Sequence, residues 1–196
     1  MPSSDPRILT ETCREIILQN PKTVLDIGIG FGKWGVLARE YTDIWNQRFY
    51  PSEWETFIVG VEVHSKYDNP IWDVYNLVLG GEAMQVLHDI QNDVYAGRIK
   101  PEEADSAVIP PKYYDMVIMI DVLEHFEKMR GQLLIDKVME LTDKFLVSYS
   151  NLPQKDIRDN KFEDHLSTWE DKDFSRFSSK HIVGGAGWGV YLLSKK

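Results

Sequence analysis

Short apolar runs alternate with longer amphipathic stretches along most of the chain. The apolar runs have strand length and are rich in Val, Ile and Leu; they span 23–27, 57–63, 77–79, 116–120 and 145–149. Apolar residues recur at helical spacing in the stretches 8–19, 34–45, 84–90 and 129–141. Near the end, 181–183 and 190–193 flank a glycine-rich turn at 184–187. The pattern predicts strands and helices in alternation, closed by a β-hairpin.

Alternating strands and helices are typical of a parallel sheet covered by helices on both faces. We therefore expect an α/β fold: a Rossmann-like, doubly wound, mostly parallel sheet of about seven strands with an antiparallel C-terminal hairpin. The 196 residues suit a single domain spanning 1–196. Within it we expect a leading helix in 1–20, an inserted loop at 91–112, which holds three prolines, and one more helix at 169–177.

Charge argues against a nucleic-acid partner. The chain has 31 acidic and 22 basic residues and a formal net charge of -9, whereas binding to a phosphate backbone depends on Lys and Arg. No run approaches the ~18 apolar residues of a membrane span, and the first residues lack the basic and apolar regions of a signal peptide. Cys13 is the only cysteine, so no internal disulfide can form. We expect a cytoplasmic protein with no nucleic-acid or membrane partner.

Glycines and acids stand where the predicted parallel strands end. Ligands of an open parallel sheet bind in the crevice beyond the carboxyl ends of its strands. The first strand runs into Asp26-Ile27-Gly28-Ile29-Gly30-Phe31-Gly32, where glycines let the backbone approach a ligand beside a helix N-terminus. Acids follow later strands at Glu62, Glu82 and Asp121. Singly, each feature also fits a structural turn, a helix cap or a solvated loop. Together they indicate a nucleoside pocket.

The acid before the glycine loop narrows the choice of ligand. In a loop that cradles a pyrophosphate Asp26 would add repulsion, so this residue suits a cationic ligand better. The run Val24-Leu25-Asp26-Ile27-Gly28-Ile29-Gly30-Phe31-Gly32 resembles the first motif of the class I S-adenosylmethionine-dependent methyltransferases, whose cofactor carries a sulfonium and an amino group. The segments Gly81-Glu82-Ala83 and Asp121-Val122-Leu123-Glu124-His125-Phe126 are similar to later motifs of that family.

The resemblance implies S-adenosyl-L-methionine as the cofactor and no metal. It implies that the glycine loop packs against the methionine portion, that Glu62 binds the ribose and that Glu82 lies on the adenine side. The cofactor-binding residues it implies are Asp26, Gly28, Gly30, Gly32, Glu62, Glu82, Ala83 and Asp121. The chain departs from the family in a longer stretch between the glycine loop and Glu62 and in the inserted loop 91–112. The adenine side is therefore the least defined part of the site.

Methyl transfer requires an acceptor held in line with the sulfonium and, for a hydroxyl acceptor, a base. The candidate bases are His125 and His165; the structural alternatives are helix capping or packing for the first and a loop position for the second. We expect the acceptor to be an oxygen or nitrogen of a small molecule. The Asn-Pro-Pro-Tyr pattern of enzymes that methylate amino groups of nucleic acids is absent after the fourth strand, where Asp121-Val122-Leu123-Glu124 stands.

Aromatic residues crowd the two longer connections around the second strand, at Trp45, Phe49, Tyr50, Trp54, Trp72 and Tyr75. They either pack irregular loops or form part of a lid over the acceptor.

Two other kinds of function stay open at this point. The first is another enzyme of the same fold, a nicotinamide oxidoreductase or an aminopropyl transferase. The second is a catalytically silent module that binds the cofactor or a partner. A monomer and a homodimer are both compatible with the sequence.

Overall fold

The described part of the chain contains eight strands and four α-helices, joined by loops and short 3-10 turns. The computed structural model describes residues 4–94, 98–100, 108–155 and 160–196. The strands are β1 (Thr23–Ile27), β2 (Phe57–Glu62), β3 (Leu77–Gly80), β4 (Arg98–Lys100), β5 (Met116–Met119), β6 (Phe145–Ser150), β7 (Ser178–Gly185) and β8 (Trp188–Ser194). The helices are α1 (Leu9–Gln19), α2 (Lys33–Thr42), α3 (Ala83–Gln91) and α4 (Lys128–Leu141).

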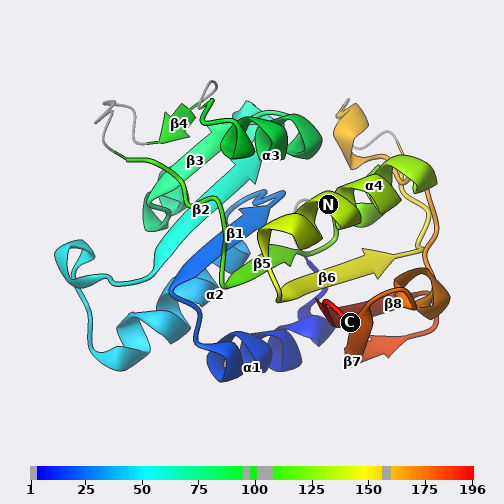
Figure 1. The fold of residues 1–196 in the computed structure, drawn as a ribbon, viewed down its shortest axis with the longest axis horizontal. Helices are drawn as coiled ribbons and strands as arrows, with labels where there is room; N and C mark the ends of the chain where they lie inside the picture. Colours follow the sequence, from blue (N-terminus) through cyan, green and yellow to red (C-terminus); the bar gives the residue numbers. More distant parts are fainter. Residues whose placement is uncertain (1–3, 95–97, 101–107, 156–159) are drawn as a thin grey trace.

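The strands form one sheet in the order β4-β3-β2-β1-β5-β6-β8-β7 (Figure 1). Neighbours from β3 to β6 are parallel, whereas β4 and β8 pair antiparallel with the strands beside them. From β1 the chain builds outward through β2 and β3, then returns to the other side of β1 with β5 and β6. The strand order therefore reverses between β1 and β5, where an open parallel sheet leaves a crevice for ligands.

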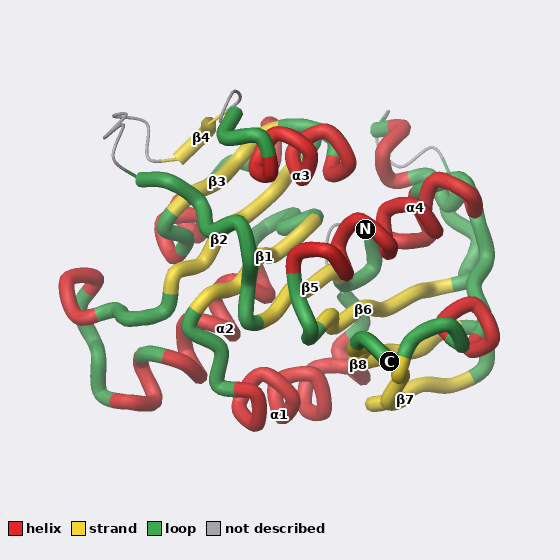
Figure 2. The backbone as a smooth tube through the Cα atoms, viewed as in Figure 1, coloured by secondary structure: helices red, strands yellow, loops and turns green. Residues whose placement is uncertain are grey.

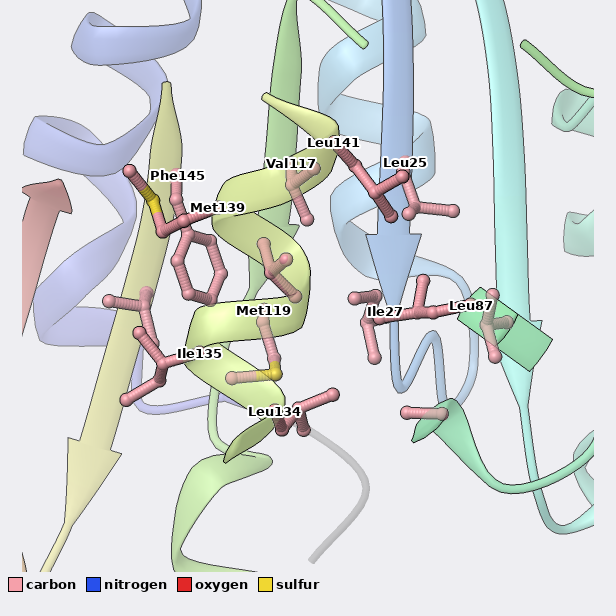
Figure 3. Packing of buried hydrophobic residues seen from close by; sticks show 14 of the residues in the cluster. Leu25, Ile27, Leu87, Val117, Met119, Leu134, Ile135, Met139, Leu141 and Phe145 are labelled. Carbon is pink, nitrogen blue, oxygen red and sulfur yellow. The ribbon is translucent and has the colours of Figure 1, made fainter. Parts of the chain in front are cut away.

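Helices cover both faces of the sheet (Figure 2). Successive strand residues point to opposite faces, so Leu25 and Ile27 pack in the cluster with α3 and α4, and Val24 packs in the cluster with α1 and α2. Figure 3 shows the first cluster, in which Leu134 and Ile135 of α4 lie against the strands. Burial of each large apolar side chain contributes roughly 1.5–3 kcal/mol. Among the described helices, none combines the length and apolar character that crossing a bilayer requires.

The doubly wound, mostly parallel sheet and its antiparallel C-terminal hairpin are confirmed. Three details differ from the sequence expectation. The segment 91–112 contains the edge strand β4, so it is not wholly a loop, and the described sheet has eight strands; residues 95–97 and 101–107 lie outside the described part. The segment 169–177 forms only a 3-10 turn, Asp171–Phe174. The outer strand β7 begins earlier than predicted, because its exposed polar start carries no hydrophobic pattern.

Candidate functional site

A cavity of about 370 Å³ opens at the carboxyl ends of β1, β2 and β5. Small-molecule sites typically measure ~300–1,000 Å³, so the size suits a ligand. The cavity lies at the reversal point of the sheet, and we call it the first cavity. Its walls come from the loop after β1, the end of β2, the start of α3, the loop after β5 and the segment 160–166.

The glycine loop after β1 has a backbone that glycine adopts most readily. Gly28, Gly30 and Gly32 have φ of 75°, 52° and 90°. A Cβ on Gly28 would lie 2.3 Å from Cγ2 of Val122, so the loop packs directly on the segment after β5. The buried indole of Trp72 donates from Nε1 to the Gly30 carbonyl at 2.9 Å and fixes the loop from behind. Backbone at Gly28 and Gly30 thus forms one wall of the first cavity.

Glu62 ends β2 and is 5% exposed. The backbone N–H of Gly30 donates to its Oε2 at 2.9 Å, and that of His64 donates to its Oε1 at 2.8 Å. Burial raises the pKa of this carboxyl, and the two amides partly offset the rise. A carboxylate has about four acceptor positions, so two remain for a ligand. That number matches a vicinal diol.

Asp26 lies beneath the glycine loop and not in the cavity wall. Its neighbours Leu25 and Ile27 face α3 and α4, so its side chain points to the opposite face of the sheet. There the Tyr75 hydroxyl donates to its Oδ2 at 2.6 Å and accepts from the Gly35 amide at 3.1 Å. Burial raises the pKa of Asp26 to about 7, although the Tyr75 hydroxyl lowers it in part. We call Asp26 and Tyr75, which support the glycine loop and do not line the cavity, the floor.

Asp121 follows β5 in a strained conformation. Its φ is 55°, in the left-handed region that non-glycine residues seldom adopt. Its amide donates to Oγ of Ser148 at 2.7 Å, and the Ser148 hydroxyl donates back to Oδ1 at 2.8 Å. Residues held in such strain tend to cluster at binding and catalytic sites. Asp121 lines the first cavity, and it is shared with a neighbouring one.

A second cavity, of about 410 Å³, adjoins the first. The two have Ser4, Asp121 and His125 in common, so these residues stand where the cavities meet. Polar residues that line only the second cavity include Glu124, Ser148, Gln154 and His165.

His125 and His165 come together although 40 positions separate them in the chain. Their rings meet edge-on with centroids 5.0 Å apart. The Leu166 amide donates to the Glu124 carbonyl at 2.8 Å, and this bond ties the two segments together. Nδ1 of His125 lies 3.1 Å from the Asp164 carbonyl oxygen, which can only accept, so this nitrogen carries the proton. Nε2 of neutral His125 is therefore left as a proton acceptor. Burial and the neighbouring His125 lower the pKa of His165.

Glu124 is fully buried in the short turn after β5. Neither carboxyl oxygen accepts a well-formed hydrogen bond from the described residues. Burial raises its pKa well above the ordinary value; the Asp121 charge adds to the rise, and the backbone amides of Glu124 and Ser150 moderate it. Buried carboxyls without donors are unusual and call for an explanation from function.

Hydrogen bonds join the two sides of the first cavity. The Tyr67 hydroxyl donates to Oε1 of Glu163 at 2.8 Å and accepts from Nδ2 of Asn160 at 3.0 Å. Burial and the Glu163 carboxylate raise the pKa of Tyr67 to about 12. These bonds hold the segment 160–163 against the loop after β2.

Acidic side chains outnumber basic ones in the walls of the first cavity. The acids are Glu62, Glu82, Asp121, Glu127 and Glu163, and the bases are Lys33, Arg130 and Lys161. Lys33 donates to the Ser4 carbonyl at 2.9 Å, and Arg130 pairs with Glu82 at 3.1 Å. The balance suits a cationic ligand better than a pyrophosphate.

No protein-family model matches the sequence. No curated protein matches it either. Solved structures resemble its fold over nearly the whole chain. An O-methyltransferase family protein from Burkholderia thailandensis superposes with a TM-score of 0.58 at 11% identity and 97% coverage of this chain. The chain spans 55% of that protein's length.

Two more solved structures resemble the fold of this chain. The PH0226 protein from Pyrococcus horikoshii OT3 has a TM-score of 0.58 at 16% identity, with 99% of this chain and 92% of that chain covered. Cofactor-bound Rv0187 from MTB has a TM-score of 0.54 at 14% identity, with 98% and 81% covered. The chain has the class I methyltransferase fold. At these identities the likeness concerns the fold alone.

Most residues singled out from the sequence meet at this site of the methyltransferase fold. The first cavity is lined by Gly28, Gly30, Glu62, Glu82, Ala83, Asp121 and His125. Gly32 lies outside the wall, as does Asp26 in the floor, so neither is placed beside a ligand in this cavity. His165 lines the second cavity and not the first.

The idea of an aromatic lid over the acceptor is wrong for the described residues. Trp72 and Tyr75 support the glycine loop from below. The connection at 46–55 leads into β2, so it lies at the amino ends of the strands, away from both cavities (Figure 1, cyan). Part of its aromatic content serves packing: Trp54 stacks on the Arg39 guanidinium at 4.1 Å.

Sequence reasoning missed four polar residues of the site: Tyr67, Glu124, Ser148 and Glu163. For Glu124 a signal existed, because it follows Asp121 by three positions in a segment already assigned to the crevice. The others depend on contacts between distant segments, which local pattern does not reveal.

Proposed function

We propose that this chain is a methyltransferase that moves a methyl group from S-adenosyl-L-methionine to an oxygen or nitrogen of a small molecule. The observation that carries the proposal is the first cavity itself. A glycine loop and a buried strand-end carboxylate, already linked by the Gly30 amide, meet there at the reversal point of a methyltransferase fold. The solved structures that resemble the chain include an O-methyltransferase in complex with SAH and PigF with SAH.

The residues of the first cavity fit this cofactor. Gly28 packs on Val122, and Gly28 and Gly30 present backbone without side chains in the wall of the cavity. Glu62 has two acceptor positions left for the ribose hydroxyls. Ala83 at the start of α3 leaves room for the adenine, and the acidic walls complement the amino group and the sulfonium.

The chain's own chemical task is to hold the acceptor and remove its proton. The cofactor, when bound, supplies an electrophilic methyl group on sulfur. His125 stands where the two cavities meet, and its Nδ1 proton is held by the Asp164 carbonyl. Its free Nε2 can take a proton from an acceptor in the second cavity while the first holds the cofactor.

Calorimetric titration with S-adenosylhomocysteine and with NAD tests the proposal. We expect the first compound to bind and NAD not to bind. In Glu62→Ala the affinity for S-adenosylhomocysteine should fall by about 10-fold or more, because hydrogen bonds to a charged group are lost. Glu140→Ala is the control, since this exposed glutamate on α4 lines neither cavity. Binding of NAD, or of neither compound, would overturn the proposal.

A further inference from the structure

Glu124 lines the second cavity, and its side chain is 0% exposed. Neither carboxyl oxygen accepts a well-formed hydrogen bond from the described residues. Two polar groups of the same lining are committed elsewhere: the Ser148 hydroxyl donates to Asp121, and Nε2 of Gln154 donates to the Glu163 carbonyl at 2.8 Å. A buried acid with two free oxygens is a binding position for a group that brings its own donors.

The charges around the second cavity favour a cation as that group. Asp121 and Glu124 contribute acids, and Arg7 is the only Lys or Arg among the described lining residues. Arg7 already pairs with Asp5 at 2.6 Å and stacks on the Trp188 ring at 4.8 Å. The remaining titratable groups are Tyr149, His125 and His165, and the two histidine rings contact each other. The described lining of the second cavity therefore contains acids, and it contains no Lys or Arg that lacks another partner.

We propose that the second cavity is the acceptor site of the methyltransferase and that it takes a basic amine, held as an ammonium by the carboxylate of Glu124. The inference rests on the proposed function and names its substrate class. Apolar walls from Ile8, Tyr149, Leu152 and Trp188 suit the carbon skeleton of such an amine.

The methyl transfer to an amine conserves protons and electron pairs at each step. On binding, the Glu124 carboxylate accepts hydrogen bonds from R–NH3+. An N–H proton then passes to Nε2 of His125, which frees the nitrogen lone pair. That nitrogen forms the new N–C bond while the C–S bond breaks and its electron pair stays on sulfur. The product is a methylated ammonium, and His125 returns its proton to solvent.

A hydrogen-bonded cation is favoured over a metal ion. Among the described residues, no group of three or more His, Cys, Asp and Glu side chains has the arrangement to hold a metal.

Binding of matched amines and alcohols tests the assignment. The protein is titrated with n-butylamine and 2-phenylethylamine, and with the alcohols of the same skeletons, with S-adenosylhomocysteine present. We expect amines to bind at least ~10-fold more tightly than alcohols, because only the ammonium pairs with the carboxylate. In Glu124→Gln this preference should vanish, while S-adenosylhomocysteine binds as in the wild type.

Glu15→Gln is the matched control, because Glu15 is also a buried carboxyl but lines neither cavity. This variant should leave the preference for amines over alcohols unchanged. Equal binding of amines and alcohols, or no amine binding while S-adenosylhomocysteine binds, would overturn the assignment. Stabilisation by MgCl2 that Glu124→Gln abolishes would also overturn it, in favour of a metal. Glu124-dependent amine binding without binding of S-adenosylhomocysteine would support the amine site and contradict the proposed function.

Discussion

Two buried acids lie near the middle of the sheet, one within β1 and one after β5, and their surroundings differ completely. Asp26 in β1 accepts from the Tyr75 hydroxyl, which the Gly35 amide holds in turn. Glu124 after β5 accepts no well-formed hydrogen bond on either oxygen from the described part of the chain. Burial raises the pKa of both. Asp26 lies outside the cavities and Glu124 lines one of them.

The difference teaches that burial alone does not identify a functional acid. A buried acid with donors of its own contributes to the fold, because removing it leaves those donors unpaired. A buried acid without donors lowers stability and is kept for what it binds. We therefore expect the floor at Asp26 to be a structural region and the loop after β5 to be the chemical one.

The largest effect should come from the chemical region. We expect His125→Gln to lower the rate of methyl transfer by about 10²–10⁴-fold, because general bases typically contribute that much. Labelled S-adenosylmethionine and the best acceptor of the amine panel give the rate. His88→Gln is the control, since this exposed histidine on α3 lines neither cavity. An equal loss in both variants would contradict the role of His125.

Substitutions in the floor should lower the free energy of unfolding. Asp26→Ala removes the acceptor of the buried Tyr75 hydroxyl and leaves a small void, so we expect it to cost about 2–4 kcal/mol. Tyr75→Phe should cost less, about 1–2 kcal/mol, because it removes one bond and leaves the packing. Urea unfolding measures both. An unfolding free energy unchanged in Asp26→Ala would mean that the floor is not structural.

The pH dependence of stability gives a finer test of the floor. The pKa of Asp26 is about 7 in the folded protein against an ordinary 3.8, so the folded state binds this proton more tightly than the unfolded state. The resulting stability is fully present below the ordinary pKa and is lost as pH rises through about 7. Asp26→Asn should remove this contribution, which amounts to at most about 1.4 kcal/mol per pH unit. Parallel pH profiles of the wild type and the variant would contradict it.

The smallest expected effect is a gain in the free energy of unfolding. We expect Glu124→Met to raise the free energy of unfolding by about 1 kcal/mol, because it replaces a buried carboxyl without partners by an apolar side chain of similar length. Thermal and urea unfolding measure the change. A loss comparable to that of Asp26→Ala would remove the contrast between the two acids.

Sequence pattern predicted the fold well because parallel strands buried on both faces leave unmistakable apolar runs, as at 116–120. It failed for β4 and for the start of β7, since edge strands are short or polar. In the site, Glu62 and Asp121 were predicted to lie in the crevice because each follows a strand, and both line the first cavity. Sequence pattern did not distinguish Asp26, whose side chain faces the other way, because the face of a side chain follows from strand register.

A crystal structure of the complex with S-adenosylhomocysteine tests the central claim most directly. We expect the ligand in the first cavity, with its ribose hydroxyls donating to Glu62 and its sulfur directed toward Asp121 and His125, where the second cavity begins. A ligand bound elsewhere, or one whose sulfur points away from the second cavity, would contradict the assignment of the two cavities to cofactor and acceptor.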